Sequence, residues 1–445
     1  MNFRNFVFWS KNVIFRKDAI NQYKDSIENQ YKTIKEIEEI NWAKRKYMVK
    51  YAYENIPFYK KFYDDCGFSP ESLKNEQDWE NVPILKKEYV RKYNETLINK
   101  NLNRRFFTKS TTGGTTGMPL KIYYDNRFKY EILTWRALNW WHVSPADNVG
   151  ILHRRVGISS IKTFKNRMLW WPTHRAYLNA TSINDEEIEA FVKSIKAHKT
   201  VWLQGYVGAL ERVADYVINN NIVINSLKLV WSTSAPLYLN VRIKMEKAFN
   251  CKIMDQYGSN EILNIALQCP KSEHLHINYD YVHVETIDEN NKIVREKEGN
   301  ILVTNLTSFV FPLIRYELGD KGCILNEKCS CGVNLPLMKT VKGRISDSLY
   351  TPSGLYIDGN YLNSVFDLYY DYIDKFQIVQ KKDYSIKVYV VKKNVSGVED
   401  VLNKIKTRLI SDVRNEVDVN IEVVDNIKDE KGKIRYIINE LDLKK

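Results

Sequence analysis

A run of glycine and hydroxyl residues between positions 110 and 117 carries the strongest chemical signal in the sequence. Glycine lets the backbone approach an anion without side-chain clashes, and hydroxyl groups and free amides donate hydrogen bonds to phosphate oxygens. The run lacks the Gly-Lys-Ser or Gly-Lys-Thr end of a Walker A loop, and it is not a dinucleotide fingerprint. Taken alone, it also fits a flexible surface turn. We predict a phosphate-binding loop formed by Ser110, Thr111, Thr112, Gly113, Gly114, Thr115, Thr116 and Gly117.

A second set of residues has the types and spacing of metal ligands, in a Cys-x6-His sequence and a later Cys-x-Cys-Gly sequence. Thiolates and imidazole suit tetrahedral zinc, and four protein ligands leave no open position for water, so such a site would serve folding. His274 is an alternative to His276, and Cys323 is either a spare ligand or a core thiol. The predicted ligands of this structural zinc are Cys269, His276, Cys329 and Cys331.

The elements that must position these residues follow from the hydrophobic pattern. Apolar residues recur at intervals of three and four from Ile34 to Tyr51, which predicts an amphipathic helix that ends before Pro57. Further along, short apolar runs alternate with helical patterns, and this alternation predicts an α/β core. The predicted strands of that core are residues 120–124, 149–152, 201–203, 227–231 and 252–254.

Two later regions differ from this core. Strand-like segments around residues 281–304 flank a polar turn and predict a smaller β element. After Gly343 the order is strand, strand, helix and strand over about 100 residues, which is near a common domain size. We therefore predict an α/β protein with a large N-terminal domain, a small α+β C-terminal domain and a boundary near residues 343–348.

Length, charge and cysteine usage limit the classes of function. The 445 residues suggest two or three domains, and 67 basic against 54 acidic residues give a net charge of +13. The excess is dispersed, and neither an RNA-recognition sheet nor a basic zipper is evident, so we do not predict nucleic acid as the main ligand. Four of the six cysteines fall between residues 269 and 331, which fits a metal site in a reducing compartment better than disulfides.

The N-terminal segment allows two hypotheses. No apolar run approaches the ~18 residues of a membrane span, and the first 17 residues lack the features of a signal peptide, so we expect a cytoplasmic protein. A helix here would either lie on the inner face of an anionic membrane or pack on its own domain. A pattern this short favours packing on the domain. The apolar face and its cations would be Phe3, Phe6, Val7, Val13 and Ile14 with Arg4, Lys11, Arg16 and Lys17.

The predicted phosphate loop is the first of five motifs that follow one another along the chain. They occupy residues 110–121, 255–261, 315–320, 342–347 and 432–435. This ordered set resembles that of the adenylate-forming acyl ligases. Residues 55–59 and the Cys-x-Cys-Gly sequence near residue 330 resemble the phenylacetate:coenzyme A ligase branch, and within it the CapK-type proteins of capsular polysaccharide synthesis.

The resemblance implies how the two domains work together. The N-terminal domain, residues 1–342, would bind ATP and a carboxylic acid and would hold the zinc site. The mobile C-terminal domain, residues 343–445, would close over them and carry the catalytic lysine. Related ligases often have consecutive acidic residues shortly after the Gly-Arg pair, whereas this chain has Ser346 and then Asp347. The resemblance therefore does not identify the residue about which the domain turns.

The resemblance also assigns nucleotide-binding residues. The loop would hold the β- and γ-phosphates, and Glu261 would help to bind Mg²⁺, because a carboxylate beside a triphosphate needs a cation between them. Asp320 would accept hydrogen bonds from the ribose hydroxyls, and adenine would lie between residues 234–236 and the ring of Tyr257. The full set beyond the loop is Ser234, Ala235, Pro236, Gln256, Tyr257, Gly258, Ser259 and Asp320.

The predicted catalytic residues are Lys433, Glu261 and Arg344. Negative charge accumulates on the phosphoryl oxygens when a carboxylate attacks the α-phosphorus, and an ammonium brought in by a closing domain stabilises that charge. Lys433 is the first candidate for this ammonium, and Lys431 is the alternative. Arg344 would contact ribose or phosphate when the domain closes.

The resemblance therefore implies an ATP-dependent ligase that forms an acyl adenylate from a small carboxylic acid. The acceptor of the acyl group is either a sugar amine or hydroxyl, in capsule or lipopolysaccharide synthesis, or the thiol of coenzyme A. A non-catalytic relative that acts as a scaffold for polysaccharide machinery is the rival from another class. The implied cofactors are ATP, Mg²⁺ and structural Zn²⁺, with coenzyme A as a candidate co-substrate.

Overall fold

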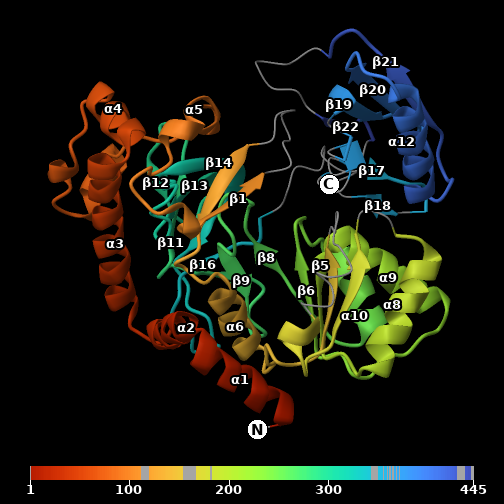
Figure 1. Ribbon diagram of the computed structural model, residues 1–445, viewed down its shortest axis with the longest axis horizontal. Coiled ribbons are helices and arrows are strands. Elements are labelled where there is room, and N and C mark those ends of the chain that lie inside the picture. The colour runs from red at the N-terminus through yellow and green to blue at the C-terminus, as the bar shows by residue number, and fades with distance from the viewer. Residues whose placement is uncertain are drawn as a thin grey trace.

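The computed structural model describes residues 2–111, 120–153, 167–180, 183–341, 349–427 and 436–441, apart from Gly354, Asp358, Asn360, Tyr361, Asn363, Ser364, Asp367 and Tyr370. The chain begins with the helices at the left and lower edge of Figure 1: α1 (Phe3–Phe15), α2 (Lys17–Asn29), α3 (Ile34–Asn55) and α4 (Pro57–Asp65). The helix predicted from Ile34 is confirmed. Thr33 and Glu36 form a capping box at its start, and Pro57 begins the next helix.

A five-stranded parallel sheet confirms the predicted α/β core. Its spatial order is β4 (Arg175–Asn179), β3 (Val149–His153), β5 (Trp202–Tyr206), β6 (Leu229–Thr233) and β7 (Lys252–Met254). Helices α8 (Asp185–Ala197), α9 (Val207–Asn219) and α10 (Leu239–Phe249) pack beside this sheet (Figure 1). The packing is close at Gly205, where an added Cβ would lie 2.6 Å from the Cβ of Leu152.

One predicted core strand belongs elsewhere. The segment predicted at 120–124 forms β2 (Lys121–Asp125), which pairs only with β1 (Phe107–Thr111), in an antiparallel hairpin. The segment between β1 and β2 is too short for the helical crossover that a parallel neighbour needs, so a local hairpin results. The same part of the chain contains α5 (Lys87–Lys92), α6 (Glu131–Trp140) and the short helices η1 (Pro70–Ser72), η2 (Glu76–Asn81), η3 (Asn94–Thr96) and η4 (Arg104–Phe106).

Two antiparallel sheets follow the core, and they include the β element predicted at 281–304. The first has the order β12 (Ile293–Val294), β11 (Val282–Ile287), β13 (Gly299–Asn305) and β14 (Tyr316–Gly322). The second has the order β15 (Ile324–Leu325), β16 (Leu337–Met338), β10 (Leu275–Ile277), β9 (Ala266–Gln268) and β8 (Gln256–Tyr257). Apolar side chains of both sheets join α3, α4 and the parallel sheet in one large core.

The C-terminal region has a separate hydrophobic core. The predicted order of strand, strand, helix and strand is confirmed, and a last strand lies parallel to the first. The elements are the hairpin β17 (Leu349–Tyr350) and β18 (Tyr356–Ile357), then β19 (Ile373–Gln380), β20 (Ile386–Lys392), α12 (Val398–Asp412), β21 (Val419–Val423) and β22 (Ile437–Asn439). Two ion pairs connect this region to α9: Arg212 with Asp412 at 3.2 Å, and Arg414 with Asp215 at 3.1 Å.

Candidate nucleotide site and metal centre

The two carboxylates predicted to serve the nucleotide each accept a hydrogen bond from a buried tyrosine. Tyr257 donates to Asp320 Oδ2 over 3.0 Å, and Tyr316 donates to Glu261 Oε1 over 3.2 Å. Burial, together with the negative charges of Asp320 and Glu261, holds the pKa of Tyr257 well above its ordinary value. The phenol therefore stays protonated and donates a hydrogen bond at neutral pH. Tyr257 lies in β8 and Asp320 in β14, so this bond joins the two antiparallel sheets.

Lys87 is a site residue that we did not predict. Its ammonium lies 2.9 Å from Glu261 Oε1, the same oxygen that Tyr316 contacts, and the Glu261 side chain is only 5% exposed. The partner cation thus offsets the cost of burying this carboxylate. In the sequence, Lys87 lies in an ordinary charged stretch, and nothing local distinguishes it from a solvated surface lysine.

Backbone pairing explains how Lys87 reaches Glu261. Leu85 N donates to the carbonyl of Arg315 and the Leu85 carbonyl accepts from Glu317 N, both over 3.0 Å, so the chain before α5 adds to β14. Arg315 is itself buried, and its guanidinium donates to the carbonyls of Glu80 and Val82. This arginine of the 315–320 motif therefore fixes the backbone that presents Tyr316 and Asp320.

The β1–β2 hairpin brings the start of the predicted phosphate loop to the same place. Tyr124 donates to the backbone carbonyl of Asn260 over 2.5 Å, next to Glu261. Ser110 hydrogen-bonds Tyr124, while burial raises the pKa of Tyr124 to about 12. Ser110 and Thr111 are the last residues of the loop's first strand, and the other loop residues, Thr112, Gly113, Gly114, Thr115, Thr116 and Gly117, lie outside the described residues.

The predicted adenine-binding segment follows β6, and side chains tie it to β8. Trp231 Nε1 donates to Gln256 Oε1 over 2.6 Å, and Asp255 accepts from the backbone amide of Gln256 over 2.8 Å. Burial raises the pKa of Asp255 to about 6. Beyond β6, Ser234 has a φ of 78°, so the chain turns sharply there before Ala235 and Pro236.

Gly258 and Ser259 form the turn that leads to Glu261. Ser259 N donates to the Ile262 carbonyl over 3.0 Å, and Ser259 Oγ accepts from Ile262 N over 3.1 Å. A Cβ on Gly258 would lie 3.0 Å from the backbone nitrogen of Asn264, which leaves little room for a side chain. The turn therefore positions Glu261 through its backbone and the Ser259 hydroxyl.

The site residues predicted in the C-terminal domain are not among those that the structure describes. Arg344 and Lys433 lie outside the described residues, as do the alternative Lys431 and the two positions after the Gly-Arg pair, Ser346 and Asp347. Their roles, and the predicted boundary near residues 343–348, stay predictions.

The four predicted zinc ligands come together. Their ligand atoms all lie within 4.8 Å of one another, with Cys269 Sγ 3.5 Å from Cys329 Sγ and Cys331 Sγ 3.3 Å from His276 Nε2. Zinc bonds of about 2.3 Å to sulfur and 2.0 Å to nitrogen place tetrahedral ligands at such separations. The residues therefore fit a zinc ion, and their thiols and imidazole suit zinc better than they suit Mg²⁺.

The surroundings of the cluster support the same ligand set. His276 Nδ1 lies 3.1 Å from the carbonyl of Leu335, which leaves Nε2 to face the sulfur atoms. The amides of Cys331 and Val333 donate to Cys329 Sγ and Cys331 Sγ, and hydrogen bonds from Cys269 and His276 lower the pKa of Cys331. A thiolate is the form that binds a metal.

The alternative ligands lie elsewhere. His274 is 3.3 Å from Glu327 and is not part of the cluster. Cys323 is a buried thiol that packs with Leu325 and Leu337, which agrees with the core alternative.

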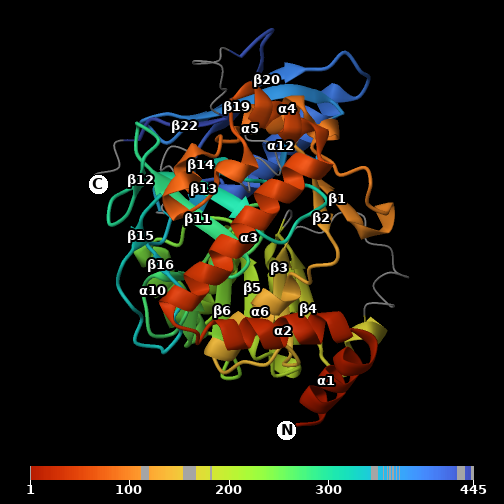
Figure 2. The same cartoon turned by 90° about the vertical axis from the view of Figure 1, so that its left-hand side faces the viewer.

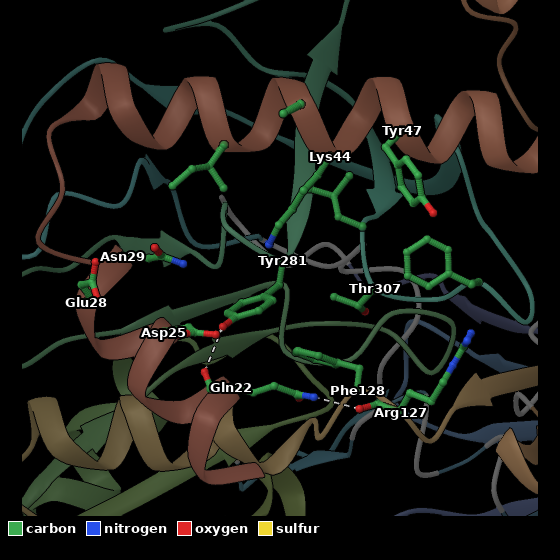
Figure 3. A pocket seen from close by; sticks show the side chains of 14 residues that line it. Gln22, Asp25, Glu28, Asn29, Lys44, Tyr47, Arg127, Phe128, Tyr281 and Thr307 are labelled. Carbon is green, nitrogen blue, oxygen red and sulfur yellow. Dashed lines mark hydrogen bonds between the residues drawn. The ribbon is translucent and has the colours of Figure 1, made fainter. Parts of the chain in front are cut away.

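A cavity of about 740 Å³ lies away from these residues, beside α2 and α3. None of the predicted nucleotide or metal residues lines it. Figure 3 shows Gln22 and Tyr281 from its wall, with Lys44 entering from α3. Lys44 donates to the Asp280 carbonyl over 2.7 Å, and Arg127 is paired with Asp125, so both cations of the wall already have partners. We assign no ligand to this cavity.

The overall fold is that of adenylate-forming ligases. A 2-hydroxyisobutyryl-CoA ligase crystallised with 2-HIB-AMP and CoA matches with a TM-score of 0.65 at 17% identity, covering 93% of this chain and 92% of that chain. The same enzyme in its postadenylation state, with R3-HIB-AMP, matches with a TM-score of 0.62 at 16% identity over 93% and 91% of the two chains.

Sequence comparisons point to particular relatives. Residues 349–440 match the CapK C-terminal domain. The chain is 24% identical to the protein CapK of Staphylococcus aureus over 99% of this chain and 97% of that protein. It is 22% identical to the phenylacetate-coenzyme A ligase of Thermus thermophilus over 84% of each chain. The predicted resemblance is thus confirmed: the chain is a relative of CapK and of the phenylacetate-coenzyme A ligases.

These comparisons also confirm the predicted fold class and the predicted class of enzyme, since the matched proteins are ligases. Among the residues that the structure describes, no helix is both long and apolar enough to cross a bilayer.

Proposed function

We propose that this protein is an ATP-dependent ligase that activates a small carboxylic acid as an acyl adenylate. An oxygen of the acid would attack the α-phosphorus of ATP, and the bond from that phosphorus to the bridging oxygen would break to release pyrophosphate. An acceptor would then attack the acyl carbon, release AMP and lose its proton. The ligase relatives and the shared fold support this reaction class.

The observation that carries the proposal is the arrangement around Tyr257. This buried phenol donates to Asp320, the carboxylate proposed for ribose. Tyr316, which lies in the same strand as Asp320, donates to Glu261, the carboxylate proposed for magnesium. Mg²⁺ held by Glu261 would neutralise charge on the phosphates. The positive charge of Lys87 pairs with the Glu261 carboxylate. Ser110 and Thr111, at the end of β1, lead into the proposed phosphate loop.

The remaining roles are those that the resemblance implies. Lys433 would stabilise the negative charge that develops at the α-phosphorus, with Lys431 as the alternative, and Arg344 would contact ribose or phosphate. Ser234, Ala235 and Pro236 would border adenine opposite Tyr257, and Gln256, Gly258 and Ser259 would hold that wall in place. The fixed partners of Gln256 and Ser259 support a positioning role for both.

We propose a sugar amine or hydroxyl as the acceptor, in capsule or lipopolysaccharide synthesis. The match to CapK along nearly the whole chain supports this choice. Coenzyme A is the second candidate, supported by the phenylacetate-coenzyme A ligase relatives and by the similar fold of a ligase that was crystallised with CoA. The rival hypothesis is a non-catalytic scaffold, which the absence of ligase activity would support.

We also propose that Cys269, His276, Cys329 and Cys331 hold one structural zinc ion. Four protein ligands leave no position for a reacting water, so the ion would link β9 and β10 to the loop that carries Cys329 and Cys331. The ion would stabilise the N-terminal domain and would take part in no step of the reaction.

The test is pyrophosphate release from ATP across a panel of amino, hydroxy and aryl acids, repeated with amino sugars and with coenzyme A. We expect release with a narrow set of acids and sustained turnover only when the right acceptor is present. The Glu261→Gln variant should lose this release, and Glu317→Gln, a change at a nearby position of β14, is the matched control. Silence with every acid would contradict the proposal and favour the scaffold.

A further inference from the structure

Large apolar side chains gather on the surface near the N-terminus. Eight of the eighteen large hydrophobic residues that are exposed in the described part of the chain come from α1 and from residues 168–171. Their exposed fractions range from 52% for Val13 to 79% for Phe15. We call this set the N-terminal patch, and its members are Phe3, Phe6, Val13, Ile14, Phe15, Met168, Leu169 and Trp171.

Direct contacts join the two segments of the patch. The rings of Phe3 and Trp171 meet edge to face with centroids 5.9 Å apart. Lys11 donates to the carbonyl of Trp171 over 2.7 Å, and its ammonium lies 5.7 Å from the centre of the same ring. Segments more than 150 residues apart thus form one surface, which the sequence pattern of α1 alone did not reveal.

The patch is not the face by which α1 packs on its own domain. Phe8 and Asn12 are the buried residues of α1, and Phe8 packs edge to face on Trp135 at 5.5 Å. Phe3, Phe6 and Ile14 lie on the other side, because residues three and eleven positions apart share a helical face. The helix thus packs on its own domain through Phe8, while Phe3, Phe6, Val13 and Ile14 of the predicted apolar face are exposed. Contact of that face with a membrane stays a prediction.

The two chain segments that carry the patch are basic in sequence. Residues 1–17 and 148–184 contain no aspartate or glutamate. Arg16 is paired with Glu131, which comes from α6 outside these two segments. The cations of these segments that the structure describes are Arg4, Lys11, Arg16, Lys17, Arg167 and Arg175.

We infer that the N-terminal patch docks this protein on the surface of a membrane that contains anionic lipid. Exposed Phe, Trp, Leu and Ile side chains insert at the boundary of headgroups and acyl chains, and surrounding lysines and arginines attract the negative lipid surface. A second copy of the chain is a poorer occupant, because a two-fold contact through the patch would bring like charges together.

The position of the patch suits this partner. In both views α1 lies at the lower end of the molecule, whereas α12 and strands β19–β22 lie at the upper end (Figures 1 and 2). A protein docked through α1 would therefore leave the C-terminal elements clear of the membrane.

The experiment is co-sedimentation of the full chain with vesicles of phosphatidylcholine, with or without 30% phosphatidylglycerol. We expect binding to the anionic vesicles and at least tenfold weaker binding to phosphatidylcholine alone or at about 0.5 M salt. The Phe6→Glu/Leu169→Glu variant should lose binding at least tenfold. The matched control, Val223→Glu/Ile243→Glu, changes two residues of similar exposure outside the patch and should bind normally.

Two results of the vesicle experiment would overturn the inference. One is absence of binding by the unchanged protein, and the other is equal loss in the variant and its control. Circular dichroism and thermal unfolding of both variants show whether a loss reflects misfolding. Sedimentation velocity supplies the second readout, since a dimer that dissociates only in the Phe6→Glu/Leu169→Glu variant would identify a second copy as the occupant instead.

Discussion

The candidate metal centre is built around a single sheet, whereas the candidate nucleotide site combines residues from several sheets and a helix. The candidate ligands of the metal centre come from the residue that follows β9, from β10 and from one loop, and their four ligand atoms lie within 4.8 Å of one another. The nucleotide site combines β14, β8, the end of β6, the β1–β2 hairpin and the start of α5, and the resemblance adds residues of the C-terminal domain. A stabilising ion needs one fixed arrangement, whereas a reacting site must assemble around its substrates.

Replacing Lys433 should have the largest effect on the reaction, and it should leave the metal centre unchanged. Lys433→Ala is expected to slow adenylation by about 10³-fold, because it removes charge stabilisation specific to the transition state. ATP binding, measured by calorimetry, should change little, and the metal content should stay at one zinc per chain.

Lys431→Ala is the matched control for this lysine. It should keep nearly normal adenylation. If Lys431→Ala were the slow variant and Lys433→Ala the normal one, the two roles would be exchanged.

Breaking the metal cluster should affect stability rather than the reaction. Cys329→Ser is expected to lose the zinc and to lower the free energy of unfolding by on the order of 4 kcal/mol. Elemental analysis and chemical denaturation provide the two measurements. Cys323→Ser, which changes the neighbouring core thiol, should keep the metal. Protein that is free of metal and equally stable would rule out the structural zinc.

The ribose contact should give a smaller effect. Asp320→Asn removes the charged acceptor that also receives the Tyr257 hydrogen bond, and we expect the KM for ATP to rise roughly tenfold with a smaller change in kcat. Steady-state kinetics with saturating acid make this measurement. A drop in kcat alone would instead place Asp320 in the chemical step.

The smallest effect concerns Lys87. Its ammonium contacts the Glu261 carboxylate that we propose for magnesium, so Lys87→Met should lower the Mg²⁺ concentration needed for half-maximal activity by about threefold. The metal-free variant should also be less stable, by about 1 kcal/mol, since a mostly buried carboxylate loses its partner. A higher magnesium requirement would show that Lys87 serves the phosphates rather than competing for Glu261.

The sequence predicted the parts of the fold that have long periodic patterns. The helix from Ile34, four strands of the parallel sheet and the order of the C-terminal elements were all predicted correctly. The five-stranded antiparallel sheet was not predicted, because β8, β15 and β16 contain two residues each and show no periodicity. The strand at 120–124 was placed in the wrong sheet, since its apolar residues do not reveal its partner.

The candidate site shows the same limit. The cluster of three cysteines and one histidine was predictable because these residue types are rare and chemically specific. Lys87 was not, because its contact with Glu261 depends on the pairing of Leu85 with Tyr316, which are far apart in the sequence. The N-terminal patch likewise depends on a contact between Phe3 and Trp171. Contacts of this kind come from tertiary structure and leave no local pattern.

The central claim is that this site forms an acyl adenylate. The most direct measurement is exchange of labelled pyrophosphate into ATP, with the carboxylic acid present and every acceptor left out. We predict exchange that depends on the acid and on Mg²⁺ and that is absent in Lys433→Ala. Binding of ATP without any exchange, for every acid that the panel contains, would contradict the claim.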